Sequence, residues 1–274
     1  MGSKYPSVLT IAGSDCSGGA GIQADLKTFA ALGCYGTSAI TAITVQNTVG
    51  VQKLHKLPPE LVKDQIIAVM DDIQCAAIKI GMIHNRRLTE TIAPTLKEYK
   101  VPIIFDPVMV ATSGDLLLEA DAVDSLKKVL FPLCALVTPN LDEASVLTSM
   151  EICSLRDMEN AAWSLIEEGC KAVLIKGGHL KGTELFDLYL DHQGEQHIFS
   201  TTWIDTNNTH GTGCTLSSAI AAYMARGLDL LTAIEKARQY VHKAILYGKN
   251  VKTGKGHGPL NHSFDPEKMQ FGRL

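Results

Sequence analysis

Short apolar runs alternate with amphipathic stretches along most of the chain. The apolar runs, each ending at a polar or glycine-containing cluster, cover residues 7–13, 37–45, 77–80, 102–105, 135–138 and 172–176. Between them, apolar side chains recur at helical spacing over residues 22–30, 59–73, 85–99, 121–130 and 155–168. Strands that alternate with helices in this way predict a parallel sheet covered by helices on both faces.

The pattern changes after residue 176. Residues 186–190 and 196–199 are two apolar-rich segments separated by a polar turn at 192–195, which predicts an antiparallel hairpin at the edge of the sheet. We find no internal repeat, low-complexity tract or linker, so residues 1–274 are expected to form one α/β domain.

Several polar or small residues fall at predicted strand ends. Ligands of open α/β sheets gather outside the carboxyl ends of the parallel strands. We therefore expect one edge of the sheet to carry Gly13, Gln46, Met82, Asp106, Asn140 and Lys176.

A glycine-rich segment, Thr209-His-Gly-Thr-Gly-Cys-Thr215, leads into a predicted helix that ends near Gly227. The first turn of a helix has backbone N–H groups without intrahelical partners, and glycines let an anion approach them closely. Gly211 and Gly213 therefore suit a phosphate cradle, although from these residues alone a simple turn is an equal alternative.

A second glycine-rich loop, residues 16–21, follows the first predicted strand. Gly19-x-Gly21-x-x-Ala24 fits a relaxed dinucleotide-binding fingerprint, which also requires an acidic residue about 20 positions later for the ribose. No Asp or Glu lies between Asp25 and Glu60, so we do not expect a nicotinamide cofactor.

Composition excludes several classes of protein. The net charge is -4 and no basic run is present, which argues against nucleic acid as the main partner. No apolar run reaches the length of a membrane span, and the N-terminus lacks the apolar core of a signal peptide, so we expect no membrane partner and a cytoplasmic location. The 7 cysteines are scattered without a C-x-x-C pair, which indicates neither a disulfide framework nor a zinc site.

The predicted sheet edge carries the residue types that phosphoryl transfer needs, although no P-loop motif is present. Lys176, followed by two glycines, could reach a phosphate or could be an ordinary exposed strand-end lysine. Asn140 and Glu143 could hold Mg²⁺ or could form a helix-capping pair. Asp106 could be a further metal ligand or a turn residue. Taken together, these residues favour a kinase.

The motifs also resemble a known family over nearly the whole chain. They are TIAGSDCSGGAGIQADLK (10–27), QNT (46–48), KIGM (79–82), DPVM (106–109), TPNLDE (138–143), KGGH (176–179), NTHGTGC (208–214) and GHGP (256–259). Together they resemble the hydroxymethylpyrimidine/phosphomethylpyrimidine kinases of thiamine biosynthesis, in the ribokinase superfamily. The resemblance implies a three-layer α/β/α fold with a mostly parallel sheet, and a homodimer. It gives no reason to expect a fused thiamine-phosphate synthase or thiaminase-like segment.

The same resemblance implies an activity and a set of site residues. ATP, with Mg²⁺, would phosphorylate 4-amino-5-hydroxymethyl-2-methylpyrimidine and then its monophosphate, while dependence on a monovalent cation such as K⁺ stays open. The implied substrate-binding residues are Gly13, Asp25, Gln46, Met82, Val108 and Cys214. The residue types at the sheet edge and in the glycine turn, taken with the resemblance, predict ATP binding by Asn140, Lys176, Thr209, Gly211 and Gly213. The expected metal ligands are Asp106 and Glu143, and the expected catalytic group is Gly211, Thr212, Gly213 and Cys214.

Cys214 distinguishes the chain from the sugar kinases of this superfamily, which carry an aspartate base at that position. A thiol at a helix N-terminus is expected to have a lowered pKa, which would make Cys214 a weak base. Direct contact with the substrate is an equal alternative.

Two other functions are compatible with these residues. A pyridoxal or pyridoxine kinase could share the scaffold, but some such enzymes use a second cysteine in the loop after DPVM, and residues 110–114 contain none. A non-enzymatic nucleotide- or vitamin-binding module would not need Lys176, the metal pair and the cradle together. The loop that closes over the substrate is expected at 110–115 or at 179–184.

Overall fold

A computed structural model of the chain describes residues 3–109, 122–178 and 184–273. Two of its strands form a separate small sheet and the others form one large sheet. The strands are β1 (Ser3–Lys4), β2 (Ser7–Asp15), β3 (Tyr35–Asn47), β4 (Gly50–Lys56), β5 (Ala77–Ile80), β6 (Ile103–Phe105), β7 (Leu136–Val137), β8 (Ala172–Lys176), β9 (Glu184–Asp191), β10 (Gln196–Thr202) and β11 (Gly272–Arg273).

The large sheet has nine strands in the order β10-β9-β8-β7-β6-β5-β2-β3-β4. The six strands from β8 to β3 pair in parallel, as the alternating pattern predicts. The predicted edge hairpin is confirmed by the antiparallel pair β9–β10. The opposite edge carries a second antiparallel strand, β4, which the sequence analysis did not predict.

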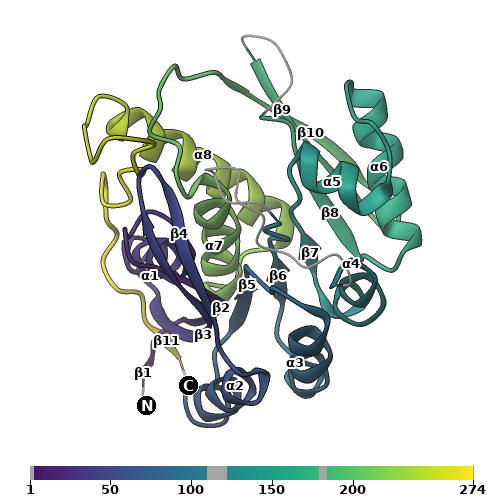
Figure 1. Ribbon diagram of the computed structural model, residues 1–274, viewed down its shortest axis with the longest axis vertical. Helices are drawn as coiled ribbons and strands as arrows, with labels where there is room; N and C mark the ends of the chain where they lie inside the picture. Colours follow the sequence, from purple (N-terminus) through teal and green to yellow (C-terminus); the bar gives the residue numbers. More distant parts are fainter. Residues whose placement is uncertain (1–2, 110–121, 179–183, 274) are drawn as a thin grey trace.

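Helices cover both faces of this sheet (Figure 1). They are α1 (Gly21–Ala31), α2 (Pro59–Asp72), α3 (Arg86–Glu98), α4 (Ala122–Ser125), α5 (Leu141–Thr148), α6 (Leu155–Glu167), α7 (Thr212–Ala225) and α8 (Leu230–Gly248). One buried apolar cluster joins the sheet to α2, α3, α5 and α6, and the other joins it to α1, α7 and α8. Alternate residues of β2 supply the two clusters, Leu9 and Ile11 on one side and Val8 on the other, which makes the three-layer arrangement that the fold class predicts.

Some elements differ from those that the sequence predicts. The helix expected over 121–130 begins as the short α4 and continues as a π-helical turn, Leu126–Leu130, a rare form that spacing does not reveal. Helix α8 was not predicted. The two segments expected to close over the substrate, 110–115 and 179–184, lie outside the described residues apart from Glu184, the first residue of β9.

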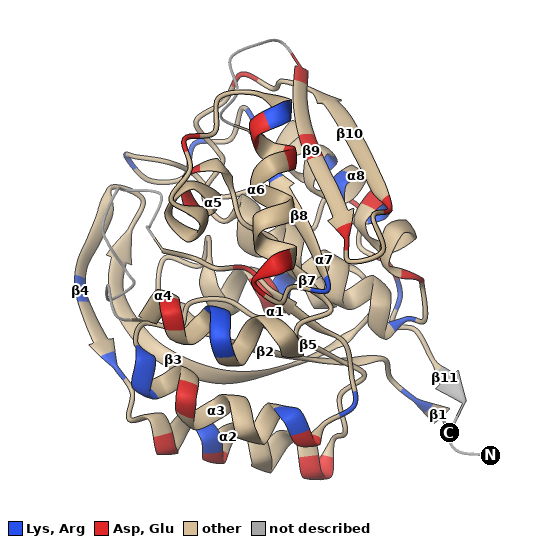
Figure 2. Ribbon diagram, turned by 90° about the vertical axis from the view of Figure 1, so that its right-hand side faces the viewer, with Lys and Arg blue, Asp and Glu red and all other residues tan. Residues whose placement is uncertain are grey.

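Charged side chains of both signs are mixed on the helices, as the small net charge of -4 leads one to expect. Acidic and basic side chains are interspersed along α2 and α3 rather than separated by sign (Figure 2). Within the described part of the chain, no helix has both the length and the apolar character that a membrane crossing requires.

Candidate active site

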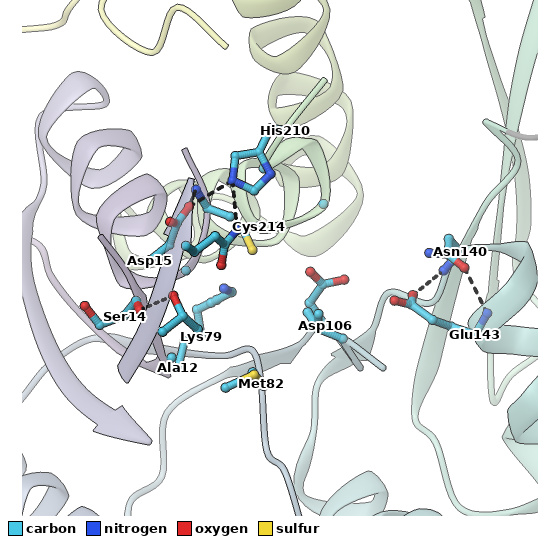
Figure 3. Close-up of a pocket in the computed structure, with 18 of the residues that line it drawn as sticks. Ala12, Ser14, Asp15, Lys79, Met82, Asp106, Asn140, Glu143, His210 and Cys214 are labelled. Carbon is cyan, nitrogen blue, oxygen red and sulfur yellow. Dashed lines mark hydrogen bonds and ion pairs between the residues drawn. The ribbon is translucent and has the colours of Figure 1, made fainter. Parts of the chain in front are cut away.

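A cavity of about 170 Å³ lies at the carboxyl ends of the parallel strands. It is lined by Ala12, Gly13, Ser14, Asp15, Ala20, Gly21, Thr44, Gln46, Lys79, Met82, Asp106, Val108, Asn140, Glu143, Lys176, His210, Gly211, Gly213 and Cys214. Figure 3 shows Asp15, Lys79, Met82, His210 and Cys214 on one side and Asn140 and Glu143 on the other, with Asp106 between the two groups. All six residues predicted at strand ends therefore share one site.

The two glycine-rich loops are packed against each other beside this cavity. Gly211 has a φ of 89°, and a Cβ there would lie 1.9 Å from the carbonyl oxygen of Gly19. A Cβ on Gly19 would in turn lie 2.2 Å from the ring of His210. Helix α7 begins immediately after Gly211 without a side-chain cap, so its first turn faces the cavity in the manner of an anion site.

An Asp15–His210 pair joins these loops, and the sequence analysis did not assign either residue to the site. His210 Nε2 lies 2.9 Å from Asp15 Oδ2, and Asp15 also accepts hydrogen bonds from the backbone N–H groups of Ser17 and Ala20. Burial by itself raises the pKa of Asp15, but these hydrogen bonds, that of His210 foremost, outweigh it and hold the pKa well below its usual range. The loop that resembles a dinucleotide fingerprint is therefore organised around a carboxylate.

Lys176 reaches into the cavity between two carboxyl groups. Its Nζ lies 2.7 Å from Asp106 Oδ1 and 3.8 Å from Glu143 Oε2. Burial alone lowers the pKa of Lys176, but Asp106 and Glu143 outweigh it and raise the pKa. Gly213 packs closely against this ion pair, since a Cβ on Gly213 would be 3.2 Å from Lys176 Nζ and 3.3 Å from Asp106 Oδ2. Lys176 is thus not the exposed strand-end lysine that the sequence left as an alternative.

Asn140 and Glu143 form the capping box that the sequence analysis gave as one of two alternatives. Asn140 Oδ1 accepts from the Glu143 N–H at 2.9 Å, and Glu143 Oε2 accepts from the Asn140 N–H at 2.7 Å, at the start of α5. Both residues nonetheless line the cavity, so capping does not remove them from the site. Burial, opposed by Lys176 and reinforced by Asp106, raises the pKa of Glu143 to about 7.

Asp25 departs from the substrate contact that the resemblance implies. It is fully buried and does not line the cavity. Its two carboxylate oxygens each lie 2.9 Å from Lys79 Nζ, and they also accept from the hydroxyls of Thr10 and Ser218. Lys79, which has no exposed surface and lines the cavity, is held by Asp25 from beneath. In the structure Asp25 supports the cavity floor through Lys79, and the implied direct contact with the substrate stays a prediction.

The prediction of a lowered pKa for Cys214 is wrong. Burial raises the pKa of the thiol to about 11, Lys79 partly opposes it, and Asp25 and Asp106 add to it. The position at the start of α7 would favour a thiolate. Burial outweighs that effect, and the charge of Asp25, the ion-pair partner of Lys79, further raises the thiol pKa.

Thr209 and Thr212 also lie outside the cavity lining, although both were predicted site residues. The Thr212 N–H and hydroxyl both donate to the Thr209 carbonyl, at 3.2 and 2.7 Å. These bonds fix the turn in which Gly211 and Gly213 are presented, so the structure gives both threonines a supporting position.

The GHGP motif connects this turn to the other side of the site. The His210 N–H donates to the Gly258 carbonyl at 3.1 Å, and the His257 N–H donates to the Thr48 carbonyl at 2.9 Å, in the turn between β3 and β4. The side-chain hydroxyl of Thr48 accepts from the N–H groups of Lys255 and Gly256. The strand that carries Gln46 is therefore connected to the glycine-rich turn at 209–213 through residues 255–258.

The site offers oxygen ligands rather than a closed metal cage. Among the described residues, no group of three or more His, Cys, Asp and Glu side chains could hold a metal ion. Asp106 and Glu143 share the cavity and both approach Lys176 Nζ, and two carboxylates completed by phosphate oxygens and water are typical of Mg²⁺. The residues therefore fit Mg²⁺ bound together with a phosphorylated ligand.

Comparisons with known proteins agree with this geometry. The phosphomethylpyrimidine kinase family model matches residues 15–261. The hydroxymethylpyrimidine/phosphomethylpyrimidine kinase of Rhizobium meliloti (strain 1021) is 48% identical over 256 residues, covering 93% of this chain and 96% of that protein.

Two solved structures have the same fold. The phosphomethylpyrimidine kinase of Clostridium difficile 630 is 42% identical, with a TM-score of 0.77 over 87% of this chain and 99% of that one. The pyridoxal kinase of Bacillus subtilis, solved as an ADP complex, is 35% identical, with a TM-score of 0.86 over 95% of this chain and 98% of that one. From its matched family model and its identity to these relatives, the chain belongs to the phosphomethylpyrimidine kinase family.

Proposed function

We propose that this chain transfers the γ-phosphoryl group of ATP to the hydroxymethyl group of 4-amino-5-hydroxymethyl-2-methylpyrimidine, and then phosphorylates the resulting monophosphate to the diphosphate, for thiamine biosynthesis. The observation that carries the proposal is the single cavity that combines a small ring-sized pocket with a glycine cradle, Lys176 and two carboxyl groups. Phosphoryl transfer needs positioning and charge stabilisation more than covalent chemistry, and these groups supply both.

One part of the cavity suits a flat heterocycle. Gln46 offers a donor and an acceptor for a ring nitrogen and an amino group, while Met82 and Val108 supply apolar surface. Gly13 keeps this part open, since a Cβ there would lie 2.7 Å from the terminal methyl of Met82. These residues would hold the pyrimidine ring.

The other part suits phosphate groups. The first turn of α7, entered through Gly211 and Gly213, presents backbone N–H groups, and Lys176 adds a positive charge at its edge. Together they would neutralise charge on the group in transfer. The acceptor of the second step, the monophosphate, already carries a phosphate group. The site would therefore have to accept either the hydroxymethyl group or this phosphate beside the same glycine cradle.

Asp106 and Glu143 would hold Mg²⁺, directly or through water. When bound, the ion would neutralise charge on the phosphate oxygens and orient them. Lys176 would then exchange its ion pair with Asp106 and Glu143 for contact with the nucleotide phosphates. Burial raises the pKa of Glu143 to about 7. A cation beside this carboxyl group would lower the pKa and favour the ionised form.

Cys214 would act as a substrate contact rather than a base. With a pKa of about 11, only about one molecule in ten thousand carries the thiolate at neutral pH. A neutral thiol is a weak donor and a small apolar surface, which suits a position beside the hydroxymethyl group.

A pyridoxal or pyridoxine kinase is the second candidate, and one observation favours it: the TM-score to the Bacillus subtilis pyridoxal kinase, 0.86, exceeds that to the Clostridium difficile phosphomethylpyrimidine kinase, 0.77. Overall shape does not determine ring specificity, which depends on side chains in the cavity. The matched family model and the 48% identical relative favour the pyrimidine.

We also propose that residues 1–274 act as one domain within a cytoplasmic homodimer. A single large sheet bears both apolar clusters, which supports one domain, and all seven cysteines are free, which suits a reducing compartment. Light scattering should give twice the mass of one chain; the mass of a monomer would overturn the dimer.

The experiment is a coupled ATP-turnover assay with Mg²⁺ and four acceptors: the hydroxymethylpyrimidine, its monophosphate, pyridoxal and pyridoxine. The proposal expects turnover of the first two with higher kcat/KM than of the last two, and repeating the assay with and without K⁺ tests the monovalent cation. Preference for pyridoxal with an inert monophosphate would replace the proposal by the second candidate. Binding of ATP without turnover of any acceptor would leave only a binding protein.

A further inference from the structure

Cys16 holds the backbone of Gln46 through its thiol. The thiol donates to the Gln46 carbonyl oxygen at 3.1 Å and accepts from the Gln46 N–H at 3.3 Å. One side chain therefore satisfies both polar backbone groups of a single residue 30 positions away in the sequence. Cys16 itself is exposed and does not line the cavity.

The contact lies where β3 has lost its pairing with β2 and its pairing with β4 is irregular. On one side, the parallel pairing with β2 ends at Asp15 and Thr44. On the other, the antiparallel pairing with β4 shifts register between Val45 and Gln46 and resumes with Gln46 opposite Val51. Such an irregularity re-aims the side chains beyond it and weakens the ladder that would fix them. Cys16 is the first residue beyond β2, and its thiol bonds the Gln46 backbone on the side where β2 has ended.

The position of the Gln46 side chain depends on the backbone that the Cys16 thiol holds. It lines the cavity, and its Nε2 lies 3.4 Å from Nε2 of His210, which is paired with Asp15. A change in the backbone at residue 46 would therefore move the amide that faces the ring pocket. Small displacements of positioning groups have large effects on binding and rate.

We propose that Cys16 is a positioning residue for the acceptor site: its thiol fixes the backbone of Gln46 beyond the β3 irregularity and thereby aims the Gln46 amide at the acceptor ring. The functional half of this inference rests on the proposed function, because Gln46 is assigned to the ring of the acceptor. The structural half, that the thiol restrains residue 46, does not depend on the substrate.

Three variants of the full-length chain test the inference. Cys16→Ala removes both hydrogen bonds, and Cys16→Ser keeps a donor and an acceptor in a shorter side chain. Cys153→Ala is the matched control, because Cys153 is also an exposed cysteine but its thiol donates to the surface carboxylate of Glu151. Each variant is compared with wild type by hydrogen exchange at the Gln46 amide and by steady-state kinetics with hydroxymethylpyrimidine and ATP.

In Cys16→Ala we expect the Gln46 amide to exchange roughly tenfold faster, because its hydrogen-bond acceptor is gone. We expect KM for the pyrimidine to rise about fivefold, with KM for ATP and kcat within about twofold of wild type. Cys16→Ser should recover most of both effects, and Cys153→Ala should show neither. A general loss of stability would instead raise both KM values or speed exchange across the whole sheet.

Two results would overturn the inference. Unchanged exchange at Gln46 in Cys16→Ala would show that the thiol does not restrain this residue. Faster exchange with an unchanged KM for the pyrimidine would show that the restraint has no role in acceptor binding. If the wild-type chain does not turn over the pyrimidine, the proposed function fails, and exchange at Gln46 still decides whether Cys16 restrains it.

Discussion

Replacing Lys79 with methionine removes one partner of an ion pair that has no access to water. Lys79 and Asp25 are both fully buried, and Nζ lies 2.9 Å from each carboxylate oxygen. Burial by itself would lower the pKa of Lys79, and its raised pKa reflects the stronger opposing effect of Asp25. Methionine fills a similar volume, so Lys79→Met chiefly removes the charge and its hydrogen bonds.

The expected cost follows from what remains. Removing one partner of a buried ion pair typically lowers the free energy of unfolding by about 3–5 kcal/mol, because the other charge is left uncompensated. Two donors to Asp25 survive, the hydroxyls of Thr10 and Ser218, and they place the expectation near the lower end, about 3 kcal/mol. The double variant Lys79→Met/Asp25→Asn removes both charges and should lie within about 2 kcal/mol of wild type.

Urea unfolding at pH 7, followed by circular dichroism, measures these free energies. We expect the double variant to be more stable than Lys79→Met, because it no longer leaves a charge on Asp25, so the two substitutions are strongly non-additive. A loss below about 1 kcal/mol in Lys79→Met, or a double variant that loses the sum of the two single losses, would refute it.

Two further predictions concern His262 and Gly211. Burial, aided by Lys27, lowers the pKa of His262 from 6.5 to about 4, so the unfolded chain binds a proton between these values that the folded chain does not. The contribution of neutral His262 to the free energy of unfolding is fully present above pH 6.5. It is lost as pH falls towards 4, by at most about 3 kcal/mol. His262→Gln should flatten that part of the curve of unfolding free energy against pH, and an unchanged slope would contradict the assignment. Gly211→Ala should lower turnover by roughly 10²-fold, since its Cβ would meet the Gly19 carbonyl. The matched control is Gly227→Ala, where φ is a similar 90° but no atom of the described residues lies within 4 Å of the added Cβ. Equal activity losses in the two variants would mean that backbone strain, and not the fit between the loops, is responsible.

The positions at strand ends could be predicted because periodicity locates strands and parallel strands share one functional edge. Gly13, Met82, Asp106 and Lys176 all line the cavity for this reason. Strand β4 was missed because Gly50–Lys56 is half-buried or exposed throughout and carries polar residues, so it lacks the apolar alternation of a strand. Helix α8 did leave a signal in the sequence that was overlooked: Asp229 is a typical N-cap residue, and its side chain accepts from the Thr232 N–H in the first turn.

The partners of buried charges could not be predicted from spacing. Asp25 and Lys79 are 54 positions apart, and nothing in either local sequence shows that they meet. The same limit explains the error at Cys214. A helix N-terminus is visible in the sequence, but the burial that raises the thiol pKa is a property of the assembled layers.

The central claim is that one cavity carries out two successive phosphorylations of a pyrimidine. It is tested most directly by incubating the purified chain with the hydroxymethylpyrimidine, excess ATP and Mg²⁺, and following the products by ³¹P NMR. The account predicts that the monophosphate signal rises first and is then replaced by the two coupled signals of a diphosphate ester. A monophosphate that accumulates to the full amount of acceptor and stays unchanged, or an acceptor that is never phosphorylated, would contradict it.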